Sequence, residues 1–449
     1  MRCYIGLDIG TSAVKGVLLS MDGRVLAERS GQFEYYSQNG AKLMKPEHFL
    51  EICFGVIKSL AEYPGAEVAA ICPSGASGNL LLLDNDFSPL IPIIGWQSRH
   101  DADESSAYFT EDERAELYHK IGWRVGSGFP LVHLMWMKKN RPELIENAAM
   151  ICMHIEYLNF ALCGKFGISH SMGTPFFLLD QVKGEYNRPL LEKLGIDEEK
   201  LPPIYNKSYV LGNITEEAAK RLNLGINTKV ALGTFDHPAG ALGAGVFEKG
   251  DMLLSCGTSW VELFPAESRE KAVSAGVLTD RYMLEGSPYC IMCSITSVSE
   301  KIAEYRAHFF AGISFAEFDA YAKKAQPGCN GLRFDFSCED YEKAAGFSKN
   351  DIARAIIESA AAILAENLSG MEAKGFPAKK IRIIGGITNS PVCVKIIAET
   401  LGRDICVING VSAGAVGSAM LAAIGVGDFE SEASCFEKMN FKEIEFEHG

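Results

Sequence analysis

The chain has 449 residues, of which 47% are hydrophobic and 22% charged, and its formal net charge at pH 7 is −14. This length suits two or three domains, and the composition is that of a globular protein with sizeable cores. The acidic balance without a basic run argues against a nucleic-acid-binding protein, and no apolar stretch reaches the roughly 20 residues that span a bilayer.

The first elements that we expect form a meander followed by a helix. The strands are at residues 4–8, 17–20 and 24–28, and the helix is at residues 45–63. Asp22-Gly23 between two strand-like runs is a strong hairpin signal. The turn Gly10-Thr11-Ser12 follows the first strand, so we expect it to face a ligand.

The middle of the first half alternates strands with helical segments. We expect strands at residues 68–72, 80–83, 91–96 and 231–234, and a helix-rich region at 131–164. Thr110 and Glu113 have the spacing of a capping box and predict a helix that ends near Ile121.

The second half repeats this order. We expect strands at residues 252–256, 260–264 and 381–384, and helices at 350–374, 391–401 and 413–424. Ser390-Pro391 and Gly402 are typical start and stop signals for the second of these helices. The last helix is rich in Gly and Ala, which predicts close backbone packing. Alternating strands and helices indicate an α/β architecture, with the domain change near residues 243–250.

The thirteen cysteines are scattered and odd in number, which predicts reduced thiols and a cytoplasmic protein. The N-terminal run also lacks the basic start of a signal peptide. Cys290 and Cys293 have metal or redox spacing, but no second pair follows and their neighbours are apolar. We therefore interpret them as part of a buried structural strand.

The same tripeptide, Gly-Thr-Ser, occurs at residues 10–12 and 257–259, each time after an apolar strand. Backbone amides and short hydroxyls of this kind can hold phosphate oxygens. Asp236 lies between small residues and is the candidate base, although it could instead cap the helix that follows. Lys15 is interpreted either as a phosphate ligand or as a solvated hairpin lysine.

Taken in order, these motifs resemble the FGGY carbohydrate kinases, over nearly the whole chain. Asp8-Ile-Gly-Thr-Ser12 resembles the first phosphate motif, and Gly257-Thr258-Ser259 the second. The stretch from 138–143 to 201–202 is similar to the family's helical middle. Asp236, followed by Gly-Ala-Leu-Gly-Ala-Gly at 240–245, lies where the family has its catalytic base. Residues 385–391 resemble the adenosine motif, with Ile387 in place of its usual third glycine.

The resemblance implies an α/β fold with two similar ribonuclease H-like (actin-like ATPase) domains and a cleft between them. We expect an N-terminal domain at residues 1–245, with the sugar site, the first phosphate motif and the catalytic aspartate. The C-terminal domain, at 246–449, would carry the second phosphate motif and the adenosine motif.

The resemblance also implies a mechanism, in which the γ-phosphate of ATP passes to a hydroxyl of a ketose or polyol. Asp236 would be the general base, and Asp8 would hold Mg²⁺ through water. The expected ATP-binding residues are Gly10, Thr11, Ser12, Lys15, Gly257, Thr258, Ser259, Gly385, Gly386 and Asn389. No Walker-type motif is present. We expect the sugar or polyol and ATP as small-molecule partners, no nucleic-acid or membrane partner, and a homodimer.

The residues that would bind the sugar depart from the family pattern. The expected set is Ser77, Gly78, Trp96, Ser98, Arg99 and His237. Ser98 stands where relatives usually have an aspartate, and Ser77 and Gly78 are smaller than usual, which predicts extra room and fewer acceptors for hydroxyls. His237 could line the pocket or pack structurally, and Trp96 could serve the core or the sugar.

Two other functions stay open at this point. One is a kinase-like protein that binds ATP and a ligand without phosphoryl transfer, which the presence of Asp236 argues against. The other is an ATP-driven chaperone of the same fold superfamily, which would carry a peptide-binding extension after its last core helix.

Overall fold

The computed structural model describes residues 1–76, 78–98, 108–126, 128–257, 259–408 and 412–449. The chain divides into two units. Unit 1 comprises Met1–Gly245, Ser268–Cys290 and Val411–Asn440, and unit 2 comprises Val246–Glu267, Ile291–Gly410 and Phe441–Gly449. The first change of unit, after Gly245, falls where we expected the domain boundary, but two later segments return to unit 1.

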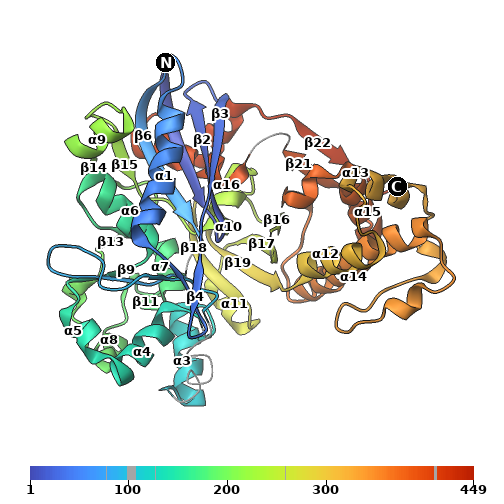
Figure 1. Ribbon diagram of the computed structural model, residues 1–449, viewed down its shortest axis with the longest axis horizontal. Helices are drawn as coiled ribbons and strands as arrows, with labels where there is room; N and C mark the ends of the chain where they lie inside the picture. Colours follow the sequence, from blue (N-terminus) through green and yellow to red (C-terminus); the bar gives the residue numbers. More distant parts are fainter. Residues whose placement is uncertain (77, 99–107, 127, 258, 409–411) are drawn as a thin grey trace. The chain divides into compact units, whose positions relative to one another are not determined.

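The central sheet of unit 1 has six strands in the order β14-β15-β6-β1-β2-β3 (Figure 1). Their bounds are β1 Arg2–Ile9, β2 Ala13–Ser20, β3 Val25–Gln32, β6 Glu67–Gly75, β14 Val210–Asn213 and β15 Lys229–Ala231. β1, β2 and β3 pair as an antiparallel meander, whereas β6 is parallel to β1. The predicted hairpins and the turn after the first strand are confirmed.

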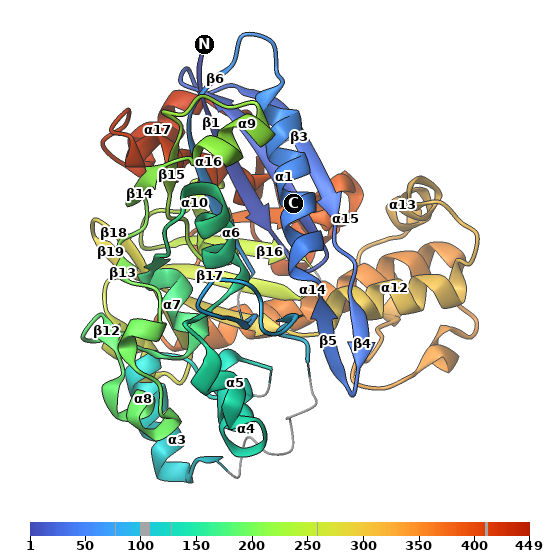
Figure 2. The ribbon, with the colours of Figure 1, turned by 60° about the vertical axis from the view of Figure 1, so that its left-hand side comes forward.

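Helices cover both faces of this sheet (Figure 2). A Cβ on Gly16 would approach Val56 and Leu60 of α1 (Pro46–Ala61), and a Cβ on Gly6 would overlap the backbone of α16 (Ala413–Gly425). Gly16 pairs with Leu7 in the β1–β2 register. Because successive side chains alternate between faces, α1 and α16 lie on opposite sides of the sheet.

The remaining elements of unit 1 are short. They are β4 Tyr36–Gln38, β5 Ala41–Met44, β7 Leu81–Leu83, β8 Ile93–Ile94, α3 Glu111–Ile121, α4 Pro130–Asn140, α5 Pro142–Asn147, β9 Met150–Cys152, α6 His154–Cys163, β10 Ile168–Ser169, α7 His170–Phe176, β11 Leu179–Asp180, β12 Glu185–Tyr186, α8 Arg188–Leu194, η2 Glu198–Lys200, β13 Ile204–Tyr205, α9 Glu216–Leu222, α10 Asp236–Gly243, α11 Arg269–Ser274, β18 Leu278–Leu284 and α17 Glu432–Met439. The Thr110 capping box is present. The strand expected at 91–96 shrinks to β8, since Pro92 has no N–H to donate.

Unit 2 repeats the arrangement with other residues. β16 (Asp251–Cys256) pairs antiparallel with β17 (Trp260–Ala266) and parallel with β20 (Lys380–Gly385), as β1 does with β2 and β6. The sheet continues through β21 (Ile405–Ile408) to β22 (Glu443–Phe446). This likeness of the two sheets agrees with the expected pair of similar domains.

The other elements of unit 2 are mostly helical. They are α12 Val298–Phe309, α13 Phe315–Lys324, η3 Cys329–Gly331, η4 Tyr341–Ala344, α14 Lys349–Ala373, η5 Gly386–Asn389 and α15 Pro391–Leu401. The boundary between the two units falls within the strand β19 (Ser287–Ile295). This strand carries both Cys290 and Cys293, so their interpretation as strand residues is confirmed. All thirteen cysteines are free thiols.

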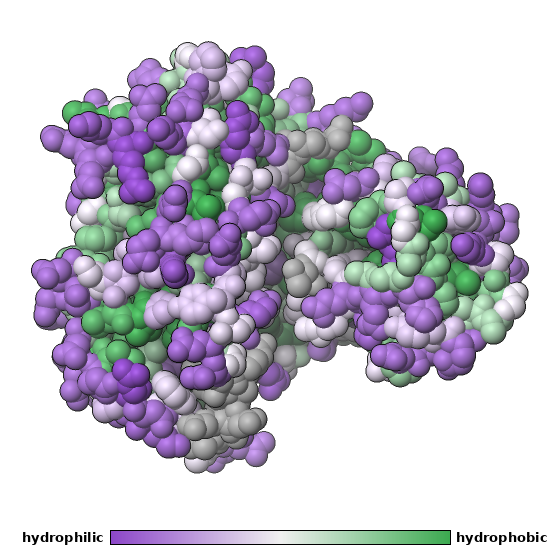
Figure 3. Space-filling view, in the orientation of Figure 1, coloured by the Kyte–Doolittle hydropathy of each residue, from purple (hydrophilic) through white to green (hydrophobic). Residues whose placement is uncertain are grey.

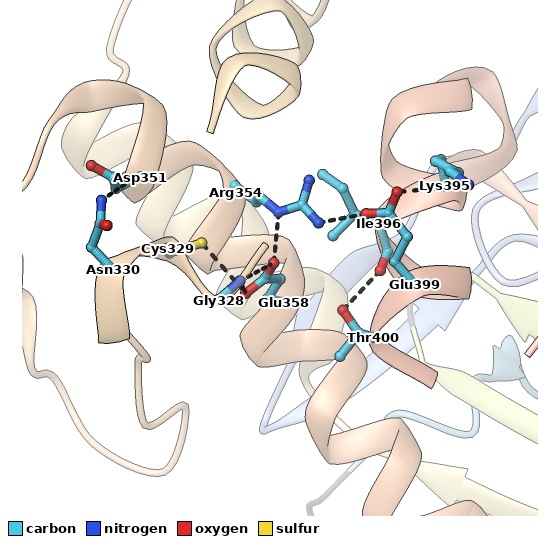
Figure 4. A network of polar contacts seen from close by, with 10 residues as sticks. All are labelled: Gly328, Cys329, Asn330, Asp351, Arg354, Glu358, Lys395, Ile396, Glu399 and Thr400. Atoms are coloured by element: carbon cyan, nitrogen blue, oxygen red, sulfur yellow. Dashed lines mark hydrogen bonds and ion pairs between the residues drawn. The ribbon is translucent and has the colours of Figure 1, made fainter. Parts of the chain in front are cut away.

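A buried ion-pair network joins α14 to α15 (Figure 4). Arg354 of α14 lies 2.6 Å from Glu358 and 2.5 Å from Glu399 of α15. Glu358 also accepts the backbone N–H of Gly328 at 3.1 Å, which attaches the loop before η3.

Hydrophilic side chains predominate on the face of the molecule that Figure 3 shows. None of the helices in the described part of the chain is long and apolar enough to cross a membrane.

Candidate active site

The first Gly-Thr-Ser turn closes the hairpin between β1 and β2. The amide of Gly10 donates to the carbonyl of Ala13 at 2.9 Å, and the hydroxyl of Thr11 accepts from the indole Nε1 of Trp96 at 3.0 Å. Ser12 is exposed. The turn is therefore held by its neighbours while the hydroxyl of Ser12 is accessible.

Asp8 and Asp236 form the electrostatic centre of unit 1. Burial and, to a smaller extent, the negative charge of Asp236 raise the pKa of Asp8 to about 7, with Lys15 partly offsetting both. Lys15 is directly opposite Asp8 in the β1–β2 register. The two carboxylates and the lysine are thus close enough to interact.

Asp236 is the first residue of α10, so its charge lies at the positive end of the helix dipole. Its Oδ1 accepts the backbone N–H of His237 at 2.8 Å, and about a quarter of its side chain is exposed. The N-cap of α10 is Phe235, which makes no side-chain cap. Asp236 therefore combines a helix-terminal position with a solvent-accessible carboxylate.

The glycines around this centre allow close backbone contact. A Cβ on Gly243 of α10 or on Gly417 of α16 would overlap the backbone of the other helix. The close packing predicted for the last Gly/Ala-rich helix is therefore confirmed, and it brings a segment near the C-terminus against the helix that carries Asp236.

Gly78 and Trp96, two of the sugar-binding residues expected from the sequence, lie against the ring of Phe129. This ring belongs to an aromatic cluster that the sequence analysis missed. A Cβ on Gly78 would lie 2.9 Å from Cδ1 of Phe129 and 2.9 Å from Cβ of Trp96. Gly78 has a φ of +82°, a conformation that favours glycine. The space that the small residue leaves is filled by Phe129 and Trp96, so the extra room expected at Gly78 is absent.

The cluster continues from Phe129 toward the proposed base. The ring of Trp123 lies edge-on to Phe129 at 5.8 Å and to Phe235 at 5.6 Å, and Phe235 lies edge-on to His237 at 5.2 Å. Phe129, Trp96 and His237 are only partly buried. The glycines at 122, 126 and 128 around Trp123 and Phe129 were a signal that could have identified this loop.

Ser98 is engaged by the backbone rather than open. Its hydroxyl accepts the N–H of Lys42 at 3.0 Å and lies 3.2 Å from the carbonyl oxygen of the same residue. The side chain is fully buried. Three of the expected site residues, Ser77, Arg99 and Thr258, lie outside the described residues.

In unit 2 Gly257, the first residue of the second expected phosphate motif, is tied to the start of α12. Ser299 donates to the carbonyl of Gly257 at 2.7 Å and accepts from Nε1 of Trp260 at 3.0 Å. A cavity of about 570 Å³ opens beside the N-terminus of α12, and Ser297, Lys301, Arg333 and Lys343 are among its lining residues. The carboxylate of Asp335 also lines this cavity, so its lining carries both positive and negative side chains.

The expected adenosine residues lie at the end of β20, which includes Gly385, and in η5, which includes Gly386 and Asn389. A Cβ on Gly385 would lie 2.6 Å from the carbonyl carbon of Cys256, so glycine is needed there for the approach of β20 to β16. Gly386 has open space around its Cα, and Asn389 is exposed at the end of η5. Within the described residues, no group of three or more His, Cys, Asp or Glu side chains could hold a metal ion.

Comparison with known proteins agrees with this arrangement. Residues 3–243 match the N-terminal domain of the FGGY family of carbohydrate kinases, and residues 252–426 match its C-terminal domain. A xylulose kinase of Bacillus subtilis is 25% identical over 98% of this chain and 91% of its own length. An autoinducer-2 kinase of Salmonella typhimurium is 24% identical over 97% of this chain and 88% of its own length.

The solved structure of a ligand-bound xylulose kinase from Lactobacillus acidophilus has the same fold. Its TM-score is 0.90 at 21% identity, covering 100% of this chain and 94% of that one. The chain therefore belongs to the FGGY family of carbohydrate kinases and is an ATP-dependent sugar kinase.

Proposed function

We propose that this kinase transfers the γ-phosphate of ATP to a hydroxyl of a ketose or polyol, with Asp236 as the general base. The observation that carries the proposal is that two carboxylates lie close enough to interact. Asp236 is partly exposed at the N-terminus of α10, and Asp8 is the nearby carboxylate with the raised pKa. A carboxylate in this position can accept the proton of the attacking hydroxyl. The ketose class rests on the xylulose kinases among the similar proteins.

Asp8 is the residue that would hold Mg²⁺. Oxygen donors suit this ion, which usually keeps several of its waters and needs few protein ligands. When bound, Mg²⁺ neutralises negative charge on the phosphate oxygens. The cation would also offset the burial of the Asp8 charge and its repulsion by Asp236, the two causes, in that order, of the raised pKa of Asp8.

For the nucleotide, we propose contacts from each unit. In unit 1 these are Gly10, Thr11 and Ser12, with Lys15 supplying positive charge. In unit 2 they are the turn at 257–259 and the segment Gly385, Gly386 and Asn389. The cavity beside α12 is a further element in unit 2 that could contact the nucleotide, because the exposed Arg333 lines it. Lys301 and Lys343 also line it, but they form ion pairs with Glu304 and Asp340.

For the sugar, we propose contacts with Trp96, Phe129 and His237, with Gly78 giving the aromatic rings room to approach. The apolar C–H face of a sugar packs on aromatic rings, while its hydroxyls need polar partners. Ser77 and Arg99 remain proposed polar partners. Ser98 would act by holding Lys42 and the chain after Trp96, since its hydroxyl already contacts the Lys42 backbone.

Replacement of the base tests the proposal. Asp236→Asn keeps the shape and should lower kcat by about 10²–10⁴-fold, the range of general base catalysis, in a coupled ADP-release assay over ketoses and polyols. ATP binding, measured by calorimetry, should be retained. The control is Glu216→Gln, which changes an exposed acid at the first position of another helix, α9, and should leave kcat unchanged.

Near-normal turnover by Asp236→Asn would contradict the assignment of the base. If the unaltered protein binds ATP and a sugar but releases no ADP with any acceptor, the alternative of a binding protein without phosphoryl transfer is favoured.

A further inference from the structure

The peptide just before Asp236 is held by two buried hydroxyl groups. The N–H of Phe235 donates to Oγ of Ser171 at 3.1 Å, and the N–H of Thr234 donates to Oγ of Ser74 at 3.1 Å. Both serines are at most 2% exposed. Two successive peptide groups before the proposed base are therefore fixed by side chains from α7 and β6.

The proton of Ser171 is directed toward Asp280 of β18. The Oγ of Ser171 donates to Oδ2 of Asp280 at 2.6 Å. A serine hydroxyl has one proton and two acceptor lone pairs. Donation to Asp280 consequently leaves a lone pair for the N–H of Phe235, so Asp280 orients the hydroxyl that holds the peptide.

Asp280 is the acceptor at the end of a larger network. Its Oδ1 accepts from the hydroxyl of Thr174 at 2.6 Å and from the N–H of Arg281 at 2.8 Å. Thr174 in turn accepts from Gln181 at 3.1 Å, and Gln181 accepts from Nε of Arg269 at 2.8 Å. Every side-chain donor along this path points toward Asp280, which defines the direction of each hydrogen bond.

Burying the charged and polar groups of this network costs free energy, so we ask what the network contributes. Asp280 is fully buried, and burial raises its pKa to about 7, although Ser171 and Thr174 lower it. Buried polar groups in place of apolar side chains add little net stability, but a fully satisfied network specifies one geometry. The geometry that this network defines is that of the peptide leading into Asp236.

We propose that Ser171 and Asp280 are positioning residues for the general base: through the N–H of Phe235 they set where the carboxylate of Asp236 lies. The proposal rests on the proposed function of Asp236. A general base must come within about 2.6–3.2 Å of the proton that it removes. A displacement of about 1 Å can lower the rate by roughly 10²-fold.

A pair of variants separates positioning from stability. Ser171→Ala removes the hydroxyl that contacts both Phe235 and Asp280, whereas Thr228→Val removes a buried hydroxyl that donates to the carbonyl of Val68 at 2.9 Å and lies outside this network. We expect Ser171→Ala to lower kcat by about 10–10²-fold with KM for ATP within twofold, using xylulose as the first acceptor. Thr228→Val should have a similar loss of Tm but a kcat within about threefold of the unaltered protein.

Two further variants keep the test decisive. Ser171→Thr retains the hydroxyl and should recover most of the kcat lost in Ser171→Ala. If Ser171→Ala does not fold, Ser171→Cys, which keeps the volume and weakens the hydrogen bonds, should show the same selective loss of kcat.

The proposal is overturned if Ser171→Ala keeps kcat within twofold, or if Thr228→Val loses as much kcat as Ser171→Ala. Asp236→Asn in the same assay tells the two failures apart. If Asp236→Asn is inactive while Ser171→Ala is unaffected, the base stands and the positioning role fails. If Asp236→Asn keeps its activity, the proposed function itself fails.

Discussion

Gly414 and Asp8 are in such close contact that a Cβ on Gly414 would overlap the carboxylate of Asp8. Gly414 lies in the first turn of α16, and Asp8 lies at the end of β1. A carboxylate beside a helix N-terminus is favoured by the helix dipole and by the free N–H groups there. Because Gly414 has no side chain, Asp8, the proposed Mg²⁺-binding residue, can lie against α16.

Gly414→Ala should displace Asp8, because neither the helix backbone nor the strand can move without disturbing α10 and the sheet. We expect a loss of about 1–3 kcal/mol in the free energy of unfolding, as for other overpacked sites. The Mg²⁺ concentration that gives half-maximal activity should also rise at least tenfold. Urea unfolding and a Mg²⁺ titration of kcat measure the two effects.

The control for this substitution is Gly370→Ala in α14, where a Cβ would have nothing within 4 Å. Since alanine is the better helix former, this change should stabilise the protein by about 0.4–1 kcal/mol. Unaltered stability and unaltered Mg²⁺ dependence of Gly414→Ala would show that Asp8 does not need its contact with α16.

Phe129→Ala tests whether the aromatic ring limits the size of the sugar. Removing the ring opens the space beside Gly78 and Trp96, so larger ketoses should gain relative to xylulose. We expect the ratio of kcat/KM for a larger ketose to that for xylulose to rise about tenfold. Phe315→Ala removes an exposed ring from α13 and should leave the ratio unchanged. An unchanged ratio for Phe129→Ala would remove Phe129 from the sugar site.

Glu262 of β17 should make stability depend on pH. Its carboxyl is fully buried and has no hydrogen-bond partner among the described residues, and burial raises its pKa to about 8 from 4.5. The folded state therefore keeps a proton that the unfolded chain releases above pH 4.5. The free energy of unfolding should fall as pH rises from 4.5 to 8, by up to about 5 kcal/mol.

Glu262→Gln should lack this component of the pH dependence, because its side chain is neutral throughout. Urea unfolding of both proteins at several pH values measures the difference. Glu217→Gln, a substitution of an exposed residue, should have the same pH dependence of the free energy of unfolding as the unaltered protein. Parallel pH profiles for Glu262→Gln and the unaltered protein would mean that Glu262 is not held protonated.

Arg354→Met should destabilise unit 2 strongly. The guanidinium lies between the carboxylates of Glu358 and Glu399, and its side chain is 7% exposed (Figure 4). Its loss leaves two partly buried carboxylates without their shared cation, which typically costs about 3–5 kcal/mol. Urea unfolding followed by tryptophan fluorescence measures the loss.

Arg141→Met is the matched control, because Arg141 also pairs with a glutamate, Glu143, but both side chains are about half exposed. It should cost at most about 1 kcal/mol. A similar small cost for Arg354→Met would mean that the network contributes little to stability.

Much of the fold could be predicted because its signals are local. Asp22-Gly23 predicts its hairpin, Thr110 with Glu113 predicts the start of α3, and Ser390 predicts that of α15, and the structure confirms all three. In each case the hydrogen bond joins residues at most a few positions apart. The first Gly-Thr-Ser turn was likewise identified because it directly follows an apolar strand, β1.

The sugar-binding region could be predicted only in part, since long-range contacts define it. Ser98 meets Lys42 across 56 residues, and Ser171 meets Asp280 across 109. No periodicity or motif in the sequence relates such positions. The small residues near Gly78 suggested extra room because the sequence does not show that Phe129 packs there.

The amino-acid sequence thus specified most of the elements, and it contained the two Gly-Thr-Ser motifs and the candidate base, because these depend on residues that are neighbours along the chain. Tertiary packing alone assigned residues 268–290 and 411–440 to unit 1, put Gly414 against Asp8, and joined Asp280 to the peptide before Asp236. The physical reason is that burial and hydrogen-bond satisfaction select such distant partners only when the whole core has formed.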